Sequence, residues 1–244
     1  MATKHTDVII MSGGRGTRIS QVATYYGCKS LIPINGFSAI EYVLRAVRVA
    51  TSRRIFLCIE RPELLDPISK EVQKLDQEGI EIYLDNSIRG TMHAVYKLRD
   101  RIQTNCVMVL YGHHLVRPEH LCAIHTGAEL HVVASLYNTS SNNPRSFSDI
   151  SKDGRLTKIS RGDSDVQLRE AQYYIDPPYC FPRVFTAWLQ DRGIRCHEAI
   201  KDWVEAGNAA YGCIADFPHE FHYAEELESL ARFSTELKEQ LSIQ

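Results

Sequence analysis

Apolar, strand-like runs alternate with amphipathic, helix-like segments over the first 138 residues, and this alternation constrains the fold more than any other feature. The runs are short and rich in Val, Ile and Leu, as in strands covered on both faces. The β-α-β-α order predicts an α/β protein, a three-layer α/β/α sandwich with a mixed, mostly parallel central sheet. The strand-like runs are residues 7–11, 53–60, 80–85, 106–112 and 129–138, and the helix-like segments are residues 38–50, 63–79 and 90–102. Ser38 is the expected N-cap of the first helix, and Pro67 is expected to interrupt the second.

The pattern changes after residue 138. Residues 138–146 are polar and rich in turn formers, and the Asp153-Gly154 pair predicts a β-hairpin over residues 147–162. The Asp-Pro-Pro-Tyr stretch at 176–179 is expected to break the chain before a helix. Further elements are expected at residues 181–193, 197–207 and 224–241 (helices) and 209–217 (strand). We expect one domain over residues 1–244, with an elaboration from residue 139.

Charge and cysteine usage exclude several classes of protein. The net charge is −2, which does not favour nucleic acid or an anionic membrane surface as a partner. The seven cysteines are scattered and never spaced Cys-x-x-Cys, as expected of reduced thiols rather than a disulfide framework. No stretch approaches the length of a transmembrane helix, and residues 1–11 lack the apolar core of a signal peptide. A cytoplasmic protein is the expectation.

A glycine-rich loop follows the first strand-like run, in the sequence VIIMSGGRGTRIS (8–20). Glycines allow close backbone approach to a ligand, and successive N–H groups in such a loop form an anion-binding nest. Arginine side chains in the same loop can fork onto phosphate oxygens, so a triphosphate or pyrophosphate is the expected ligand. A plain tight turn is the alternative. The dinucleotide fingerprint fails because Ile19 stands where its third glycine is required, and the Gly-Lys-Ser/Thr of a Walker loop is absent.

Lys29 stands eleven residues after Arg18, in CKSLIPING (28–36). The combination G-G-x-G-T-R followed by K-x-L-x-P-I resembles the signature of the sugar-phosphate nucleotidyltransferases (nucleotide-sugar pyrophosphorylases). Three later stretches, 87–95, 149–161 and 220–233, resemble segments of the same family, so the resemblance spans nearly the full chain. The matching signature positions are Gly13, Gly14, Arg15, Gly16, Thr17, Arg18 and Lys29.

The resemblance implies a Rossmann-like central sheet and transfer of a nucleotide from an NTP to a sugar 1-phosphate, or a similar phosphate, with release of pyrophosphate. Lys29 would bind the attacking phosphate and the α-phosphate, and Arg15 and Arg18 would hold the departing β- and γ-phosphates. Residues 1–138 would form the nucleotide-binding half, and residues 139–244 would bind the acceptor. The implied nucleotide-binding residues are Ser12, Gly13, Gly14, Gly16, Thr17, Gly90 and Thr91.

The implied metal site departs from the family pattern. In the family, an Asp after the glycine of the fourth strand and a second Asp near the C-terminus hold Mg²⁺, whereas here these positions are His113 and Glu220. Imidazole suits Zn²⁺, Mn²⁺ or Co²⁺ better than Mg²⁺. Three readings stay open: a softer divalent metal on His113 and Glu220, helped by His219 or His222; Mg²⁺ carried by the nucleotide and held by a carboxylate such as Glu220; or a homologue that binds a nucleotide or sugar with weakened or lost catalysis. Asp216 is a rival acidic ligand.

The acceptor site and the partners are less constrained. Ser160-Arg161-Gly162 stands where the family often has a Glu-Lys pair, and Arg161 with Arg145 or Lys158 would suit an anionic acceptor. The expected partners are an NTP and a sugar 1-phosphate, and a homo-oligomer is compatible with the sequence. Two rival classes are a non-catalytic nucleotide or nucleotide-sugar binding protein and a metal-independent glycosyltransferase. We interpret His93 as a packed or capping histidine rather than a base.

Overall fold

The strand-like runs of the sequence are strands in a computed structural model of the chain. The structure describes residues 6–14, 19, 25–50, 54–75, 78–85, 87, 89–124, 129–136, 146–161, 173–191, 193–214 and 226–242. The chain divides into two compact units, each assembled from separate stretches of sequence. The first comprises Met1–Ile88, Val109–Cys122 and Pro218–Gln244, and the second comprises Arg89–Met108 and Ala123–Phe217. The assignment of 1–138 and 139–244 as functional halves of one domain stays a prediction.

The sheet of the first unit is parallel where its pairing is described. Val8 of β1 pairs with Ile55 of β4, which in turn pairs with Ile80 of β5. Every residue of β1 and β4 is buried, and this explains why both read as unbroken apolar runs rather than as alternating ones. The strand order is β6-β1-β4-β5, with the last three residues of β6 in this unit. These strands are β1 (Asp7–Ser12), β4 (Ile55–Ile59), β5 (Ile80–Leu84) and β6 (Cys106–Tyr111).

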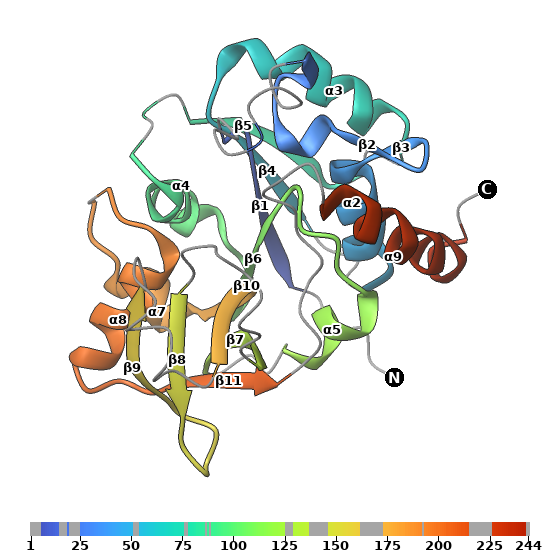
Figure 1. The fold of residues 1–244 in the computed structure, drawn as a ribbon. Helices are drawn as coiled ribbons and strands as arrows, with labels where there is room; N and C mark the ends of the chain where they lie inside the picture. Colours follow the sequence, from blue (N-terminus) through green and yellow to red (C-terminus); the bar gives the residue numbers. More distant parts are fainter. Residues whose placement is uncertain are drawn as a thin grey trace. The chain divides into compact units, whose positions relative to one another are not determined.

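Helices and one small hairpin complete the first unit (Figure 1). The Asn35-Gly36 turn of the β2–β3 hairpin docks on α9, because the Asn35 side-chain amide donates to the Ala231 carbonyl at 2.6 Å and to Ser234 Oγ at 2.9 Å. The elements are η2 (Lys29–Leu31), β2 (Pro33–Ile34), β3 (Phe37–Ser38), α2 (Ala39–Ala50), η3 (Pro62–Leu64), α3 (Leu65–Gln73), α5 (Pro118–Ala123) and α9 (Glu226–Gln240).

Two local expectations about these helices have different outcomes. Ser38 caps α2 as expected, since its Oγ accepts a hydrogen bond from the Glu41 N–H at 3.3 Å. The expected interruption at Pro67 is wrong. α3 begins at Leu65, so Pro67 lies in the first turn, where the N–H that proline lacks would have no partner within the helix.

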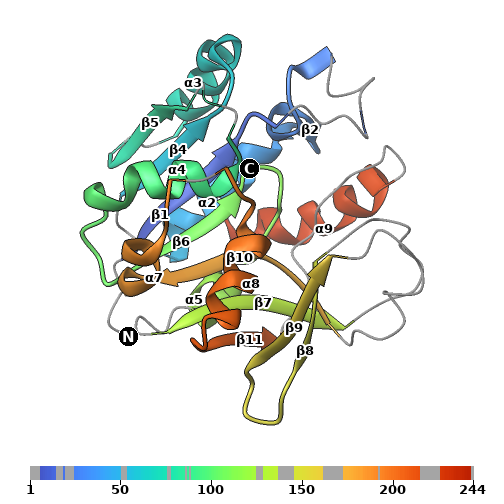
Figure 2. The ribbon, with the colours of Figure 1, turned by 90° about the vertical axis from the view of Figure 1, so that its left-hand side faces the viewer.

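The second unit is built on a mixed sheet. β10 runs antiparallel to β7 and to β8, β11 runs parallel to β7, and β8 and β9 form the hairpin expected around Asp153-Gly154. The turn of this hairpin projects away from β7 and β10 (Figures 1 and 2). The elements are α4 (Thr91–Leu98), η4 (Arg99–Arg101), β7 (Leu130–Leu136), β8 (Ser146–Ile150), β9 (Leu156–Arg161), β10 (Tyr173–Pro182), α7 (Arg183–Trp188), α8 (Cys196–Glu205) and β11 (Ala210–Ile214).

The expected break at Asp176–Tyr179 is wrong, because these residues lie inside β10. The register between β10 and β7 shifts between Asp176 and Tyr179, so the two intervening prolines fall at an irregularity that needs no ladder hydrogen bonds.

The fold class is confirmed. A mixed, mostly parallel central sheet is flanked by helices, as the β-α-β-α order of the sequence predicts. Within the part of the chain that the structure describes, none of the helices combines the length and the apolarity needed to cross a membrane.

Candidate functional site

The carboxyl end of β1 leads directly into the glycine-rich loop of the first unit. Ser12 is buried at the strand end, and Gly13 follows it with φ +123°. A Cβ atom on Gly13 would lie 2.9 Å from the Glu60 backbone nitrogen, so this position requires glycine for two independent reasons. Gly14 is exposed and has open space around it. Arg15, Gly16, Thr17 and Arg18 lie outside the described residues.

Lys29 opens the short helix η2 and is only 7% exposed. Its neighbour Ser30 is hydrogen-bonded to Ser12, with 3.2 Å between the two Oγ atoms, so the lysine segment is joined to the base of the loop. Burial raises the pKa of the Cys28 thiol, so this cysteine stays neutral and adds no charge beside the lysine. A buried ammonium group is costly unless polar or anionic groups compensate it. A lysine buried in this way is typical of a functional position.

The end of β6 lies next to the loop base at Ser12 and the lysine segment at Ser30. The Gly112 N–H donates to the Met11 carbonyl at 2.9 Å. A Cβ atom on Gly112 would overlap Ser12 Oγ and would lie 2.8 Å from Ser30 Oγ and 2.9 Å from the Ile40 Cδ1 atom. The strand end, the lysine segment and the loop base therefore converge on one glycine within the first unit.

His113 follows Gly112 and is partly exposed, whereas His114 is buried. The His113 ring stacks on Tyr111 with centroids 5.9 Å apart, and it meets the His114 ring edge to face at 4.7 Å. The structure thus places an aromatic cluster at the position where the resemblance implies a metal ligand.

The described residues do not fit a magnesium site. The donor at position 113 is an imidazole, and Mg²⁺ prefers oxygen ligands. Among the described side chains, no group of three His, Cys, Asp or Glu residues is placed to hold a metal ion. Asp216, His219, Glu220 and His222 lie outside the described residues.

Arg61 holds both ends of the glycine-rich segment, and no motif in the sequence marks it. It lies two residues after the end of β4. Its Nε donates to the Gly13 carbonyl at 3.0 Å, and its Nη2 donates to the Gly27 carbonyl. The remaining Nη1 lies 3.4 Å from a Glu63 carboxylate oxygen. These contacts with the main-chain carbonyls of Gly13 and Gly27 distinguish Arg61 from other charged residues on the surface. The residue type alone does not indicate such contacts.

Gly90 and Thr91 begin α4 in the second unit. Gly90 adopts φ +94°, and a Cβ atom there would lie 3.0 Å from the Ile194 carbonyl oxygen. The same carbonyl accepts a hydrogen bond from the Met92 N–H at 3.2 Å. Thr91 Oγ1 lies 3.3 Å from Cys196 Sγ. Close packing against residues 194–196 therefore fixes the segment that the resemblance implies in nucleoside binding.

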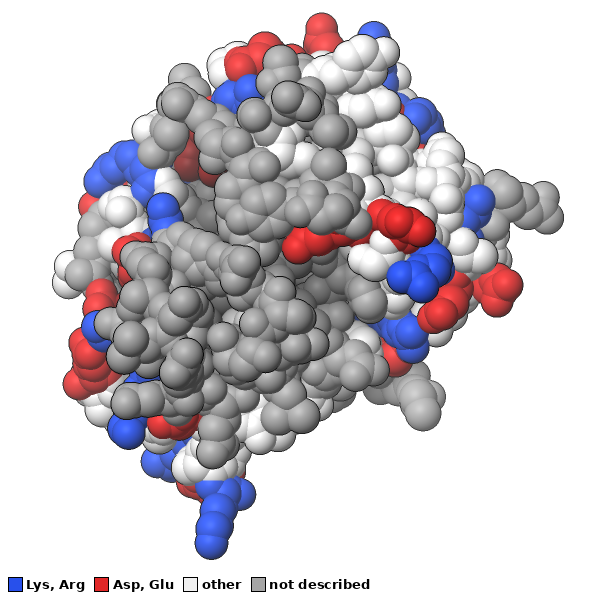
Figure 3. Space-filling model, in the orientation of Figure 1, with Lys and Arg blue, Asp and Glu red and all other residues white. Residues whose placement is uncertain are grey.

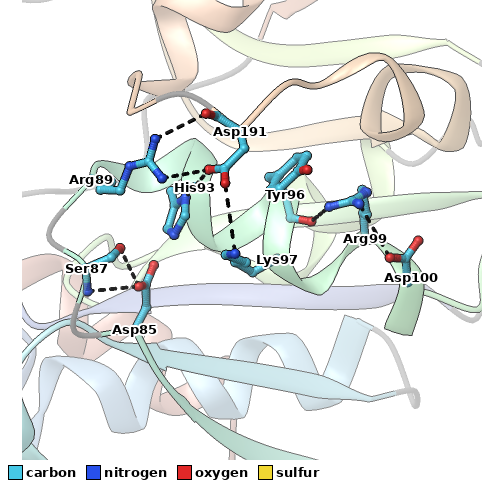
Figure 4. A network of polar contacts seen from close by, with 9 residues as sticks. All are labelled: Asp85, Ser87, Arg89, His93, Tyr96, Lys97, Arg99, Asp100 and Asp191. Atoms are coloured by element: carbon cyan, nitrogen blue, oxygen red, sulfur yellow. Dashed lines mark hydrogen bonds and ion pairs between the residues drawn. The ribbon is translucent and has the colours of Figure 1, made fainter.

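Asp191 gathers three basic side chains beside this segment (Figure 4). Its Oδ1 atom accepts hydrogen bonds from Arg89 and from His93 Nδ1, each at 2.9 Å, and its Oδ2 lies 4.0 Å from Lys97 Nζ. His93 is buried and bound to a carboxylate, in agreement with the interpretation of a packed histidine. This network braces the start of α4 from the side.

The basic residues expected near the acceptor are only partly described. Lys158 is exposed in the β8–β9 hairpin, with its Nζ atom 3.8 Å from an Asp149 carboxylate oxygen. Arg145 and the side chain of Arg161 lie outside the described residues. On the face shown in Figure 3, described basic and acidic side chains are interspersed rather than segregated by sign.

Comparisons with known proteins identify the family. The family model described as Nucleotidyl transferase matches residues 7–161, and the chain belongs to this family. The resemblance inferred from the glycine-rich loop and Lys29 is thereby confirmed. A search of curated proteins finds no significant match.

Two solved structures share the fold. The inositol-1-phosphate CTP transferase from T. maritima has a TM-score of 0.82 and 13% sequence identity, over 96% of this chain and 97% of that chain. CMP:2-keto-3-deoxy-manno-octonic acid synthetase complexed with CTP has a TM-score of 0.67 and 14% identity, over 96% of this chain and 99% of that chain. At these identities the likeness shows the fold alone, and it agrees with the α/β class.

Proposed function

We propose that this nucleotidyltransferase couples an NTP to a sugar 1-phosphate, or to a similar phosphate, giving a nucleotide sugar and pyrophosphate. The observation that carries the proposal is the convergence of three segments in the first unit. The base of the glycine-rich loop at Ser12, the segment of the buried Lys29, and the end of β6 at Gly112 meet within hydrogen-bond or van der Waals reach. A phosphate-binding loop next to a buried lysine suits phosphate attack on phosphate.

The proposed chemistry requires positioning and charge neutralisation rather than a covalent intermediate. A phosphomonoester oxygen of the acceptor attacks the α-phosphorus, and the bond to the β,γ-diphosphate breaks in line with it. Lys29 binds the attacking phosphate and the α-phosphate. Arg15 and Arg18, with the N–H groups of the loop, stabilise the departing pyrophosphate as its charge grows. Burial of Lys29 strengthens its interaction with phosphate, because water screens it less.

We propose CTP as the preferred nucleotide. Both structural neighbours are named with a cytidine nucleotide: one is a CTP transferase, and the other was solved with CTP bound. Gly90 and Thr91 are the proposed nucleoside contacts. Residues 139–244, including Lys158 and Arg161, are proposed to bind the acceptor, and an inositol phosphate belongs among the acceptors tested.

An assay of pyrophosphate release tests this function. The protein is incubated with CTP, UTP, ATP or GTP, with inositol 1-phosphate or one of several sugar 1-phosphates, and with Mg²⁺, Mn²⁺, Co²⁺ or Zn²⁺. We expect release that needs both substrates and is fastest with CTP. Thermal stabilisation by the NTP without any release would favour the non-catalytic binding protein. No stabilisation by any NTP would favour the glycosyltransferase or a lost nucleotide site.

The residue at position 113 is expected to set the metal preference. His113→Asp replaces an imidazole with a hard carboxylate, so activity with Mg²⁺ should rise relative to activity with Mn²⁺, Co²⁺ or Zn²⁺. His113→Asn, which has the shape of Asp without its charge, is the matched control. The measurement is the ratio of initial rates with each metal. Loss of activity with every metal in His113→Asp would indicate a dedicated histidine ligand, and an unchanged ratio would show that residue 113 does not contact the metal.

A further inference from the structure

Arg61 joins two points of the chain that lie on either side of the phosphate-binding segment. Gly13 and Gly27 bound the stretch that contains Arg15 and Arg18, and the Arg61 guanidinium donates to the carbonyl oxygens of both glycines. The Arg61 side chain is 23% exposed, so these bonds are partly shielded from water. A guanidinium suits this position because its rigid fork can reach two separate acceptors at once.

The Leu64 side chain lies beside the same two glycines. A Cβ atom on Gly13 would lie 3.4 Å from Leu64 Cδ1, and one on Gly27 would lie 3.0 Å from Leu64 Cδ2. Gly27 also adopts φ +86°, so any other residue there would be strained. The turn after β4 therefore places a polar side chain (Arg61) and an apolar one (Leu64) beside both ends of the glycine-rich segment.

We propose that Arg61 is a positioning residue that fixes the two ends of the glycine-rich segment, at Gly13 and Gly27, before the nucleotide arrives. The Arg61 Nε and Nη2 groups are engaged with main-chain carbonyls, so the residue acts on phosphate through the loop. Fixing both ends of a segment before binding removes an ordering cost that the nucleotide would otherwise meet. The kinetic consequences rest on the proposed function, whereas the structural consequence does not.

The proposal predicts a rise in KM for the NTP. If only a fraction of molecules holds the segment in the competent form, the apparent dissociation constant rises by the inverse of that fraction, while turnover at saturation is kept. Arg61→Lys keeps the positive charge and loses the two-acceptor fork. From the usual strength of charge-assisted hydrogen bonds, we expect KM for the NTP to rise about 10- to 100-fold. The value of kcat and the KM for the acceptor should change less than about threefold.

Arg45→Lys is the matched control. Arg45 lies on α2 in the same unit and is 31% exposed, and it also donates through Nε and Nη2, in its case to Glu41 Oε1 at 3.2 and 2.8 Å. It has no assigned part in the site, so its kinetic constants should match those of the wild type. An Arg61→Lys enzyme with a wild-type KM for the NTP would overturn the proposal, because charge alone would then suffice. An equal rise in the KM for the NTP in both lysine variants would also overturn the proposal, because it would show a general effect of replacing an arginine in this unit.

Hydrogen exchange gives a second readout that does not depend on catalysis. Without nucleotide, peptides covering Gly13 and Gly27 should exchange faster in Arg61→Lys than in the wild type, while β4 and α2 stay unchanged. If the wild type releases no pyrophosphate with any substrate pair, the proposed function fails and this comparison still decides the role of Arg61. If Arg61→Lys does not fold, the wild type alone decides. Fast hydrogen exchange of these peptides in the wild type would overturn the proposal, and slow exchange would support it.

Discussion

Lys29→Met is expected to remove most of the pyrophosphate-releasing activity while the protein stays folded. Methionine has nearly the length of lysine and is apolar, so it fills the same buried space without a charge. The lost ammonium group would otherwise bind the attacking phosphate and the α-phosphate, where charge develops in the transition state. By analogy with the loss of one oxyanion-hole donor, kcat/KM should fall about 10²- to 10³-fold. The measurement is initial-rate kinetics with the best NTP and acceptor pair, beside a thermal unfolding scan.

Arg18→Ala is expected to have an effect of the same order, because it removes the cation that we propose to hold the departing pyrophosphate. Lys74→Ala is a control for the loss of a lysine in the same unit, since Lys74 is exposed and pairs with Glu71 at 2.7 Å at the end of α3. Near-normal activity in either Lys29→Met or Arg18→Ala would refute the proposed assignment of these residues. A fall in activity that follows a fall in unfolding temperature would indicate lost folding instead.

The strands could be predicted from the sequence because burial on both faces leaves a direct record in residue type. β1, β4 and β6 are almost entirely buried, and each reads as an unbroken apolar run. The two local errors both involved proline. The sequence predicts breaks at Pro67 and at the Pro177-Pro178 pair, but the first lies in the opening turn of a helix and the pair lies at a register shift within a strand. Proline costs a hydrogen bond only where the structure needs the N–H that proline lacks. The residue type does not show where in a helix or strand the proline lies.

The candidate site was partly predictable for the same kind of reason. Gly13 and Lys29 carry a recognisable pattern, because close approach to phosphate restricts the residue types at successive positions. Arg61 carries no such pattern, since its contacts are carbonyl oxygens that only the folded chain brings together. Asp191 is similar, because its three basic partners lie on α4 or just before it, about a hundred positions earlier in the sequence. Long-range contacts with main-chain groups or with common charged residues leave no signature in a single sequence.

Gly112→Ala is expected to be among the most destabilising single-methyl substitutions in the first unit. The added Cβ would overlap Ser12 Oγ and would press on Ser30 Oγ and on Ile40 Cδ1, all three of which belong to buried residues. Overpacking of this kind costs about 1–3 kcal/mol, and here we expect the upper end, because the neighbours come from separate elements that cannot move together. Catalytic efficiency should fall as well, since the shift displaces the segment of Lys29 and the position of His113. The measurements are the urea midpoint and kcat/KM.

Gly14→Ala is the matched control for stability, because a Cβ atom there would meet no heavy atom within 4 Å. Its urea midpoint should correspond to a change within about 0.5 kcal/mol, as for other surface substitutions. Ser12→Ala should recover part of the stability lost in Gly112→Ala, because removing the Ser12 hydroxyl opens the space that the new methyl group needs. If the double variant is no more stable than Gly112→Ala alone, the close approach of Ser12 and Gly112 is not the cause. Recovery of stability without recovery of activity would separate two roles of these residues. Gly112 would then permit the packing, and Ser12 with Ser30 would hold the lysine segment in place.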